Sequence, residues 1–314
     1  MDTTITVDIN EDDIFNYGKS IFNILLKDRT TNKNIIWATD DYTKYGALYE
    51  AHCEIDIALI TGINTNIIQP RITKSQKKQN DRTKEKAEVF TPLWVCNEQN
   101  NLVDERWFGR KNVFNVSHHK SWSSTTENII FTKKRGWKDY IDARRMEISC
   151  GEAPYLVSRY DTITGETIKL KDRIGLLDRK IRVVNENTKT ESEWLKWVER
   201  AFQSIYGFEF QGDNLLLARE NLLFTFIENL QFRFNRNPTE RELKKIATII
   251  SWNIWQMDGI LFMPPYNDIA KEECQLTLFE ENGTYKDNKK SKNCIIKDWR
   301  SKKIIEYRSL LEIY

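Results

Sequence analysis

Arg145-Met-Glu-Ile-Ser-Cys-Gly-Glu-Ala-Pro-Tyr-Leu-Val157 is the stretch around which we expect the chain to fold. It predicts a β-strand that ends near Glu147, a sharp turn at Gly151 and then a short helix. Open α/β sheets hold nucleosides at such places, because glycine lets the backbone come close and a carboxylate accepts hydrogen bonds. Ala153 stands where these loops usually carry a second glycine, so the flanking sequence has to decide what the stretch means.

Composition indicates an ordinary folded protein. The 314 residues are 40% hydrophobic and 30% charged, with a net charge of +2, which suits one large domain or one and a half. No apolar run is long enough to span a bilayer, and the first residues are no signal peptide. The five cysteines are scattered without zinc-ligand spacing, and the three histidines are too few for a metal site. We therefore expect a cytoplasmic protein with reduced thiols, no metal and no membrane partner.

One stretch is strongly basic although the whole chain is nearly neutral. A local basic stripe can neutralise phosphates whatever the total charge, so this stretch predicts either contact with nucleic acid or a solvated linker, with equal weight. Within 71–86 the basic residues are Arg71, Lys74, Lys77, Lys78, Arg82, Lys84 and Lys86, and the acidic ones are Asp81 and Glu85.

Helix-like and strand-like patterns alternate through the middle of the chain. Apolar spacing predicts a helix over 193–204, a strand over 205–210 and a helix over 213–232 with Asp213 as its N-cap. This alternation favours a parallel α/β sheet.

The remaining segments are interpreted from turn and capping signals. Thr239 and Glu242 match a capping box, opening a helix that should end near Ile246, and 249–260 looks like strand. Alternation on both sides of residues 300–302 predicts a C-terminal β-hairpin. Leu93 to Cys96 are expected to open a helix, with Pro92 in its first turn and Thr91 able to cap it. Residues 97–135 look like a long irregular insertion, and a hairpin is expected over 162–170.

Three acidic residues follow the candidate strands in order: Glu147, Glu209 and Asp258. The carboxyl ends of neighbouring parallel strands share one crevice, so these carboxylates should meet there. Glu209 is placed to accept both hydroxyls of a ribose, and Asp258 to accept an adenine amino group. Each carboxylate alone is better explained as a helix cap or a surface acid, whereas the ordered set is harder to dismiss.

Three motifs in this order resemble those of the S-adenosylmethionine-dependent adenine-N6 DNA methyltransferases of restriction–modification systems. Glu88-Val-Phe-Thr-Pro92 is similar to the first cofactor-contacting motif of that family. The loop at 147–153 resembles its Asp-Pro-Ala-Cys-Gly-Ser-Gly loop. Ile205-Tyr-Gly-Phe-Glu209, followed by Ala218-Arg-Glu-Asn-Leu222, resembles its ribose-binding strand and the next helix, and is the most specific match. The resemblance covers roughly 82–266.

The resemblance implies a Rossmann-like class I methyltransferase sheet, S-adenosylmethionine as cofactor and double-stranded DNA as partner, with a specificity or restriction subunit as a further possible partner. It divides the chain into an N-terminal mixed segment with the basic connector (1–80), a methyltransferase-like domain (81–270) and the C-terminal hairpin tail (271–314). The cofactor contacts that it implies are Phe90, Thr91, Pro92, Glu147, Gly151, Glu209 and Asp258.

The catalytic motif of the family is Asn, Asp or Ser, then Pro-Pro, then an aromatic residue. This chain has one Pro-Pro, in Met263-Pro264-Pro265-Tyr266, and two alignments are open. In one, Asp258 ends the third strand and the motif is missing. In the other, 258–262 is a fourth strand, so that Pro264, Pro265 and Tyr266 occupy the catalytic place, and Met263 offers no acceptor to the target amine. A plain loop is an equally good interpretation.

The sequence therefore predicts an adenine-N6 DNA methyltransferase or a modification subunit descended from one. DNA would be contacted by 71–86 and by the loop at 97–135. The alternative is a catalytically inactive module that binds cofactor or DNA as a subunit or regulator. Methylation of RNA or protein is a third possibility, because the cofactor half of the sequence does not specify the acceptor.

Overall fold

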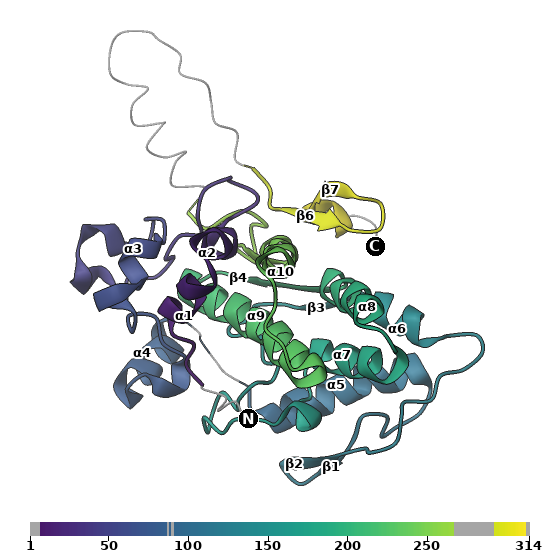
Figure 1. Cartoon of the computed structure of the whole chain (residues 1–314). Coiled ribbons are helices and arrows are strands. Elements are labelled where there is room, and N and C mark those ends of the chain that lie inside the picture. Colours follow the sequence, from purple (N-terminus) through teal and green to yellow (C-terminus); the bar gives the residue numbers. More distant parts are fainter. Residues whose placement is uncertain (1–6, 87, 89–90, 267–291, 312–314) are drawn as a thin grey trace.

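The structure is a computed structural model that describes residues 7–86, 88, 91–266 and 292–311. It is a mixed α/β fold in which a short parallel sheet lies among helices (Figure 1). The helices are α1 Glu11–Tyr17, α2 Lys19–Leu26, α3 Ile57–Ile60, α4 Gln76–Lys86, α5 Leu93–Phe108, α6 Trp137–Asp142, α7 Leu176–Asn187, α8 Glu191–Gln203, α9 Gly212–Phe234 and α10 Glu240–Asn253. Short 3-10 helices cover Thr43–Tyr45, Ala47–Tyr49, Gly62–Asn64, Arg71–Thr73, Leu170–Asp172 and Tyr307–Leu310.

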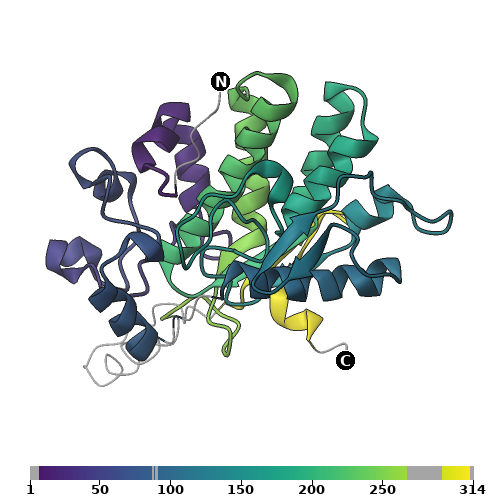
Figure 2. The ribbon, with the colours of Figure 1, turned by 90° about the horizontal axis from the view of Figure 1, so that it is seen from below.

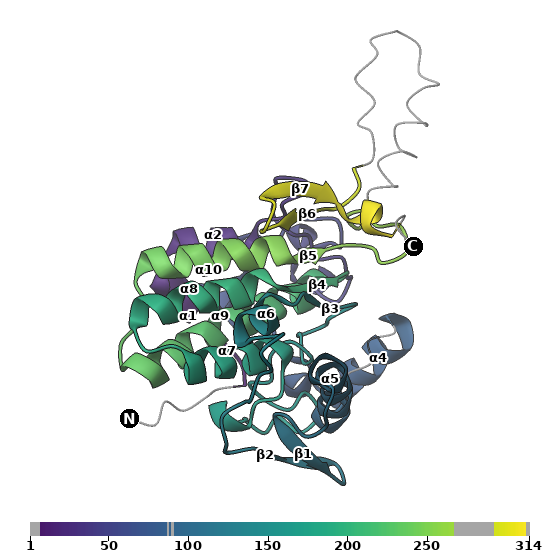
Figure 3. The same cartoon turned by 90° about the vertical axis from the view of Figure 1, so that its right-hand side faces the viewer.

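The central sheet has the strand order β3-β4-β5 and is parallel throughout (Figure 3). In its register Glu147 lies opposite Gly207, and Glu209 lies opposite Gln256. Helices α7 and α8 connect β3 to β4, and helices α9 and α10 connect β4 to β5. The strands are β3 Arg145–Glu147, β4 Ile205–Glu209 and β5 Ile254–Gln256; two antiparallel hairpins are made by β1 Asn115–His118 with β2 Ser121–Ser124, and by β6 Ile295–Asp298 with β7 Lys303–Glu306.

Alternate residues of β4 explain why this strand is buried on both faces. Ile205 packs into the large core that the helices share, whereas Tyr206 and Phe208 point to the opposite face. There they meet Ile296 and Tyr307 of the C-terminal hairpin region in a second core. The predicted hairpin is therefore confirmed, and it covers the sheet face that the helices leave open.

The N-terminal segment packs against the same helices. Helix α2 lies along α10 (Figure 1), and the chain after α2 reaches the start of α9, where the Gly212 N–H donates to the carbonyl of Trp37 at 2.8 Å. A Cβ at Gly212 would stand 2.0 Å from the carbonyl oxygen of Ile36, so only glycine permits this approach.

The helix expected after Gly151 is wrong. Residues 148–157 form successive turns, because Ser149, Gly151 and Ala153 have φ values of 48°, 52° and 64°. A helix cannot continue through left-handed residues. Ala153, at the place of the usual second glycine, thus adopts a conformation that glycine adopts more easily.

Residues 97–135 are not an irregular insertion. Helix α5 continues to Phe108, and the β1–β2 hairpin lies against it (Figure 2). The buried side of α5 carries Asn97, Asn100 and Asp104, which bond to groups on neighbouring elements. Because the buried face of α5 is polar, its sequence shows no apolar periodicity, and sequence analysis therefore did not predict the full length of the helix.

Two further expectations about strands are wrong in part, since only Ile254–Gln256 of the strand expected over 249–260 is a strand, β5. Residues 249–253 belong to helix α10, which begins with the predicted capping box of Thr239 and Glu242 but continues past Ile246 to Asn253, because its isoleucines pack in the helical core. Residues 162–170 form a turn with one bridge, between Tyr160 and Thr167, in place of a hairpin. Helix α7 was not predicted, and it buries Arg179 and Lys180 along with its apolar residues.

Candidate functional site

A cavity of about 710 Å³ opens at the carboxyl ends of β3 and β4. Its wall contains Glu147, the turn at 148–151 and Glu209, followed by Asn214 in the first turns of α9. Helix α5 forms the other side, with Val103 among its lining residues. The structure thus brings together three sequence-predicted residues, Glu147, Gly151 and Glu209, at the place where parallel strands usually bind a ligand.

Glu209 fixes the turn to the sheet. Its Oε2 accepts a hydrogen bond from the backbone N–H of Gly151 at 2.8 Å, and its Oε1 accepts one from the N–H of Gln211 at 3.2 Å. Burial raises the pKa of the Glu209 carboxyl, although these N–H groups oppose the shift by stabilising its charge. Each oxygen has a second lone pair, so the oriented carboxylate can still accept hydrogen bonds from a ligand.

Glu147 is less well satisfied. The Tyr155 N–H reaches its Oε1 at 3.4 Å, while Oε2 is buried and accepts no hydrogen bond from the part of the chain that the structure describes. Burial raises the pKa of the Glu147 carboxyl well above its ordinary value; backbone hydrogen bonds from Tyr155 and Leu156 oppose this rise, and repulsion from Glu209 adds to it. A buried acceptor without a donor costs stability, so this carboxyl is suited to a ligand that supplies one.

The charged residues that line the cavity are all acidic. Among the described lining residues, Glu88, Glu147 and Glu209 are the charged ones, and none is lysine, arginine or histidine. Two lining side chains also hold buried oxygen atoms that accept no hydrogen bond from a described group, Glu147 Oε2 and Asn214 Oδ1, whereas Glu88 Oε1 forms an ion pair with Arg71 Nε at 3.9 Å. The cavity therefore favours a ligand rich in hydrogen-bond donors and positive charge, and it disfavours phosphates.

The predicted motif at 88–92 lies at this cavity in part. Glu88 and Thr91 line it, and Pro92 is the N-cap residue of α5, so the predicted helix start is confirmed although Thr91 makes no side-chain cap. Phe90 lies outside the described residues. The Oε2 atom of Glu88 accepts hydrogen bonds from Arg82 Nε and from Asn214 Nδ2, the latter at 3.1 Å.

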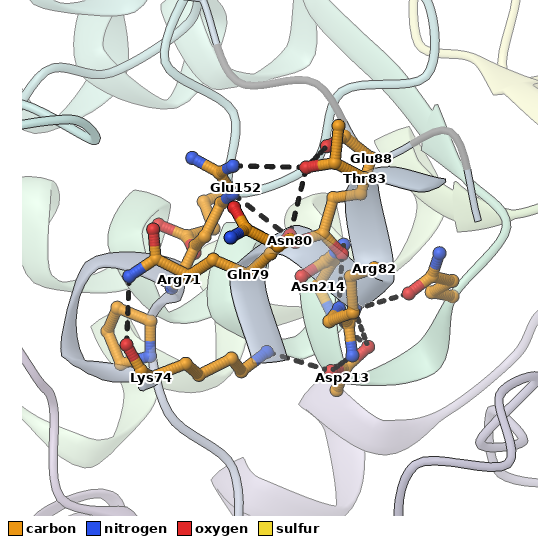
Figure 4. A network of polar contacts seen from close by, with 12 residues as sticks. Arg71, Lys74, Gln79, Asn80, Arg82, Thr83, Glu88, Glu152, Asp213 and Asn214 are labelled. Atoms are coloured by element: carbon orange, nitrogen blue, oxygen red, sulfur yellow. Dashed lines mark hydrogen bonds and ion pairs between the residues drawn. The ribbon is translucent and has the colours of Figure 1, made fainter. Parts of the chain in front are cut away.

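Arg82 joins the basic helix α4 to the cavity wall (Figure 4). Its guanidinium is buried and bonds to Glu88, Gln211 and Asp213, with Lys74 also reaching Asp213 at 3.2 Å. Burial alone would raise the pKa of Asp213, but attraction to Arg82 and then Lys74 outweighs it and holds the pKa below its ordinary value. Asp213 was predicted as an N-cap, which is wrong: Gln211 is the N-cap residue of α9, and Asp213 serves this ion-pair network.

Three lysines of α4 face solvent. Lys77, Lys78 and Lys84 are exposed, whereas Arg82 and Lys74 are buried. The basic stretch therefore contains an ordered helix over 76–86. Arg82 within this helix and Lys74 just before it hold it in place, and three of its lysines are exposed.

Asp258 does not line the cavity. Its Oδ1 accepts hydrogen bonds from the N–H groups of Ile260 and Leu261, and its own N–H donates to the Met263 carbonyl at 2.8 Å. Residues 258–262 form a turn, so the fourth strand of the second alignment is wrong, and the place given to Tyr266 rests on its ring contact with Phe210 alone. The preceding strand, β5, ends at Gln256. The side-chain amide of Gln256 donates hydrogen bonds to the carbonyls of Ile36 and Phe210.

Tyr266 does not line the cavity but contacts a residue that does, Phe210. Its ring packs edge-on to that of Phe210 with 6.0 Å between centroids, and Phe210 lines the cavity. Pro264 and Pro265 precede it, and none of the three is itself a lining residue.

Sequence reasoning missed several cavity residues, among them Asn214, Gln211 and the α5 side. Asn214 and Gln211 follow Glu209 closely in the chain. Their position just after the strand end could have identified them as cavity residues. Residues of α5 carried no such signal, because the helix was not recognised beyond Cys96.

Comparison with models of protein families, with curated proteins and with solved structures gave no significant match. In the described part of the chain, no group of three or more His, Cys, Asp or Glu side chains could hold a metal ion. No helix there is long and apolar enough to cross a membrane.

Proposed function

We propose that the cavity binds S-adenosylmethionine and that the chain is a methyltransferase-like protein of the adenine-N6 DNA type, belonging to a restriction–modification system. The observation that carries the proposal is a cavity at the ends of parallel strands whose described charged groups are all carboxylates. This cofactor carries a sulfonium, an ammonium, a carboxylate, two ribose hydroxyls and an adenine amino group, so its net charge is positive and it has no phosphate.

The acceptor atoms match such a ligand. Glu209, held by Gly151, is the group we assign to the ribose hydroxyls, and Glu147 is assigned to the positively charged part. Dinucleotides and nucleoside triphosphates would bring phosphates against Glu88, Glu147 and Glu209, and like charges brought together cost affinity.

The sheet is consistent with the proposal. Strands β3, β4 and β5 are parallel, adjacent in chain order and joined by helical connections, and acidic residues end the first two. We interpret them as part of a Rossmann-like methyltransferase sheet, in which ligands bind beyond the carboxyl ends of the strands.

DNA is the proposed acceptor because α4, which Arg82 joins to the cavity wall, displays lysines. Lys77, Lys78 and Lys84 are exposed on the helix that Arg82 anchors to the wall, so phosphates bound there would place a duplex close to the donor. An adenine turned out of the duplex would then reach the methyl group, at the cost of a few kcal/mol of stacking and pairing.

A second candidate is a module that binds the cofactor without transferring its methyl group. Met263 precedes Pro264, Pro265 and Tyr266 where a polar side chain would accept the hydrogen bonds of the target amine. Tyr266 near Phe210 supports stacking on a base, whereas Met263 favours the inactive module, working with a specificity or restriction subunit.

Incubation with tritium-methyl-labelled S-adenosylmethionine and adenine-containing duplex DNA tests the proposal. Transfer to adenine supports the methyltransferase. Cofactor binding without transfer to any acceptor supports the inactive module. If RNA or protein added to the same assay were methylated and DNA were not, DNA would be the wrong acceptor. Absence of cofactor binding would contradict both.

A further inference from the structure

A second cavity, of about 350 Å³, shares no lining residue with the cavity at the strand ends. Its lining comes from residues 124–126 at the end of β2, residues 170–173, helix α7 and the last turns of α9. The volume falls within the range of small-molecule sites. The chemistry of its walls therefore decides what it can hold.

The charges on this lining balance, in contrast to the acidic lining of the cavity at the strand ends. Three lining residues are basic and three are acidic: Lys171, Arg173, Arg182, Asp172, Asp178 and Glu186. Arg182 Nε donates to Glu186 Oε1 at 2.8 Å, and Arg182 Nη1 donates to the carbonyl of Phe114 at 3.1 Å, so this ion pair is already engaged. A balanced lining favours a ligand without net charge.

Two buried lining residues, Arg173 and Asp178, each keep one polar atom without a partner. Arg173 is 6% exposed; its Nη2 donates to Glu228 Oε2 at 2.5 Å, whereas its Nη1 donates to no described group. Asp178 is 7% exposed; its Oδ2 accepts from the Ser158 N–H at 2.8 Å, whereas its Oδ1 accepts from no described group. Unpaired buried groups cost stability, and a ligand that carries an acceptor and a donor removes that cost.

An exposed aromatic ring lines the same cavity. Phe232, near the end of α9, is 73% exposed. Aromatic faces stack on planar heterocycles, and covering an exposed phenyl ring in this way is favourable. The ring therefore selects a flat ligand.

We propose that this second cavity binds a nucleobase, which stacks on Phe232, accepts a hydrogen bond from Arg173 Nη1 and donates one to Asp178 Oδ1. A nucleobase is flat and uncharged and carries a donor beside an acceptor on one edge, which are the properties that the lining selects. Both atoms are covered by protein in the structure, so the two side chains turn toward the base as it binds.

The base can come from a free nucleoside or from an unpaired position in a nucleic acid strand, because both present the same edge. Its binding does not depend on which ligand the cavity at the strand ends takes.

The probe is 1-methylcytosine, which has the edge of a base but no ribose, phosphate or charge. The control is its derivative with two methyl groups on the exocyclic nitrogen, which keeps the ring and loses the N–H donor. Calorimetric titration of the full chain should show binding of the probe and at least about tenfold weaker binding of the control, because a hydrogen bond to a charged group is lost. Absence of heat at millimolar probe, or equal affinity for the two compounds, would overturn the proposal.

Phe232→Ala locates the base and leaves the core intact, because this ring is exposed. The control is Phe15→Ala, which removes a ring that is 40% exposed on α1. Affinity for the probe should fall at least about fivefold in the first variant, through lost stacking, and stay the same in the second. Equal affinity in the two variants contradicts the proposal. Weaker binding in Glu209→Ala, with Phe232→Ala unaffected, would put the base in the cavity at the strand ends and overturn it.

Asp178→Asn puts a donor in place of the unpaired acceptor and keeps the shape of the side chain. Asp172→Asn makes the same change of charge at another lining residue. Binding of the probe should be lost in the first variant and retained in the second, with urea unfolding to show that both fold; if Asp178→Asn does not fold, Phe232→Ala decides. Equal loss in two folded variants would show that the charge of the lining and not Oδ1 binds the base, and would overturn the proposal.

Comparison of cytidine with a single-stranded oligonucleotide of cytidines identifies the source of the base. Tighter binding of the strand that Phe232→Ala weakens indicates nucleic acid, and equal affinity per base indicates a free nucleoside; both outcomes support the proposal. Strand binding that Phe232→Ala leaves unchanged, with no binding of cytidine, would overturn it.

Discussion

The Glu209 carboxylate accepts a hydrogen bond from the backbone N–H of Gly151 at 2.8 Å, between residues 58 positions apart in the chain. This bond holds the turn after β3 against the end of β4. It also aims a carboxylate at the cavity from a position that the sheet fixes, because Glu209 ends a strand buried along its whole length. The candidate site therefore depends on the positions of backbone groups, such as the Gly151 N–H, as much as on side chains.

Binding of S-adenosylmethionine should strengthen as pH rises and should release protons. Burial raises the pKa of both Glu147 and Glu209, so these carboxyls bind protons more readily in the empty cavity than in water. A cationic ligand favours their charged forms and lowers both pKa values, and protons leave when it binds. Calorimetry in two buffers of different ionisation enthalpy measures the proton count. Proton uptake, or affinity that falls with rising pH near neutrality, would contradict the assignment.

Asp213→Ala should destabilise the protein severely. The change removes the carboxylate that pairs with buried Lys74, and Arg82 keeps only its ion pairs with Asp41 and Glu88. Losing one partner of a buried ion pair costs about 3–5 kcal/mol. Urea unfolding at neutral pH measures the free energy of unfolding. Asp81→Ala on the exposed side of α4 is the control, and it should change that free energy by no more than about 0.5 kcal/mol. If the two variants had similar free energies of unfolding, the ion pairs of Asp213 with Arg82 and Lys74 would not be what holds α4 in place.

The contribution of Asp213 should disappear in acid. Its pKa is lowered in the folded protein, so the unfolded chain binds its proton first as pH falls. The stabilisation is complete above the ordinary pKa of 3.8 and declines as pH falls below it. The difference in unfolding free energy between the wild type and Asp213→Asn should therefore shrink below that pH. A difference that grows in acid would reverse the sign and refute the ion-pair account.

Replacing Lys77, Lys78 and Lys84 by alanine should weaken binding to duplex DNA at every sequence. For each phosphate that the variant no longer neutralises, the slope of log K against log salt should become shallower by about 0.9. Fluorescence anisotropy across a salt series measures the slope. Alanine at Lys169, Lys189 and Lys303 makes the same change of charge at other exposed positions. If both triple variants bind alike, net charge and not α4 determines the affinity.

Tyr266→Ala should slow methyl transfer to adenine by roughly 10- to 100-fold, the effect of losing about 1–3 kcal/mol of stacking on a base. Tyr266→Phe keeps an aromatic ring and should retain most of the rate. The dissociation constant for S-adenosylmethionine should stay the same in both, since Tyr266 reaches the cavity only through Phe210. Transfer that is unaffected in Tyr266→Ala would remove this tyrosine from the site.

Local patterns predicted which residues meet at the strand ends beside the cavity. Glu147, Gly151 and Glu209 each follow or end a strand, and parallel pairing brings strand ends together, so short-range sequence was enough to place them. The start of α5 after Pro92 and the capping box at Thr239 were likewise readable, because their signals lie within four residues.

The sequence did not show which polar side chains are buried by residues far away in the chain. Arg82 looked like one more cation in a basic stretch, and only the fold shows that Asp213, 131 residues away, buries it. The same cause concealed α5 and α7, whose buried faces include Asn97, Asp104, Arg179 and Lys180. Asp258 was placed at the cavity by its spacing alone, but a turn bond to Ile260 directs it elsewhere.

The most direct test of the central claim is calorimetric titration of the protein with S-adenosylmethionine, comparing the wild type with Glu209→Ala and using ATP as a phosphate-bearing control ligand. The account predicts binding by the wild type and affinity lowered at least about tenfold in the variant, since a charged hydrogen-bond partner is worth about 1.5–3 kcal/mol. It also predicts much weaker binding of ATP. No heat with S-adenosylmethionine, equal affinity in the two proteins, or tighter binding of ATP would contradict it.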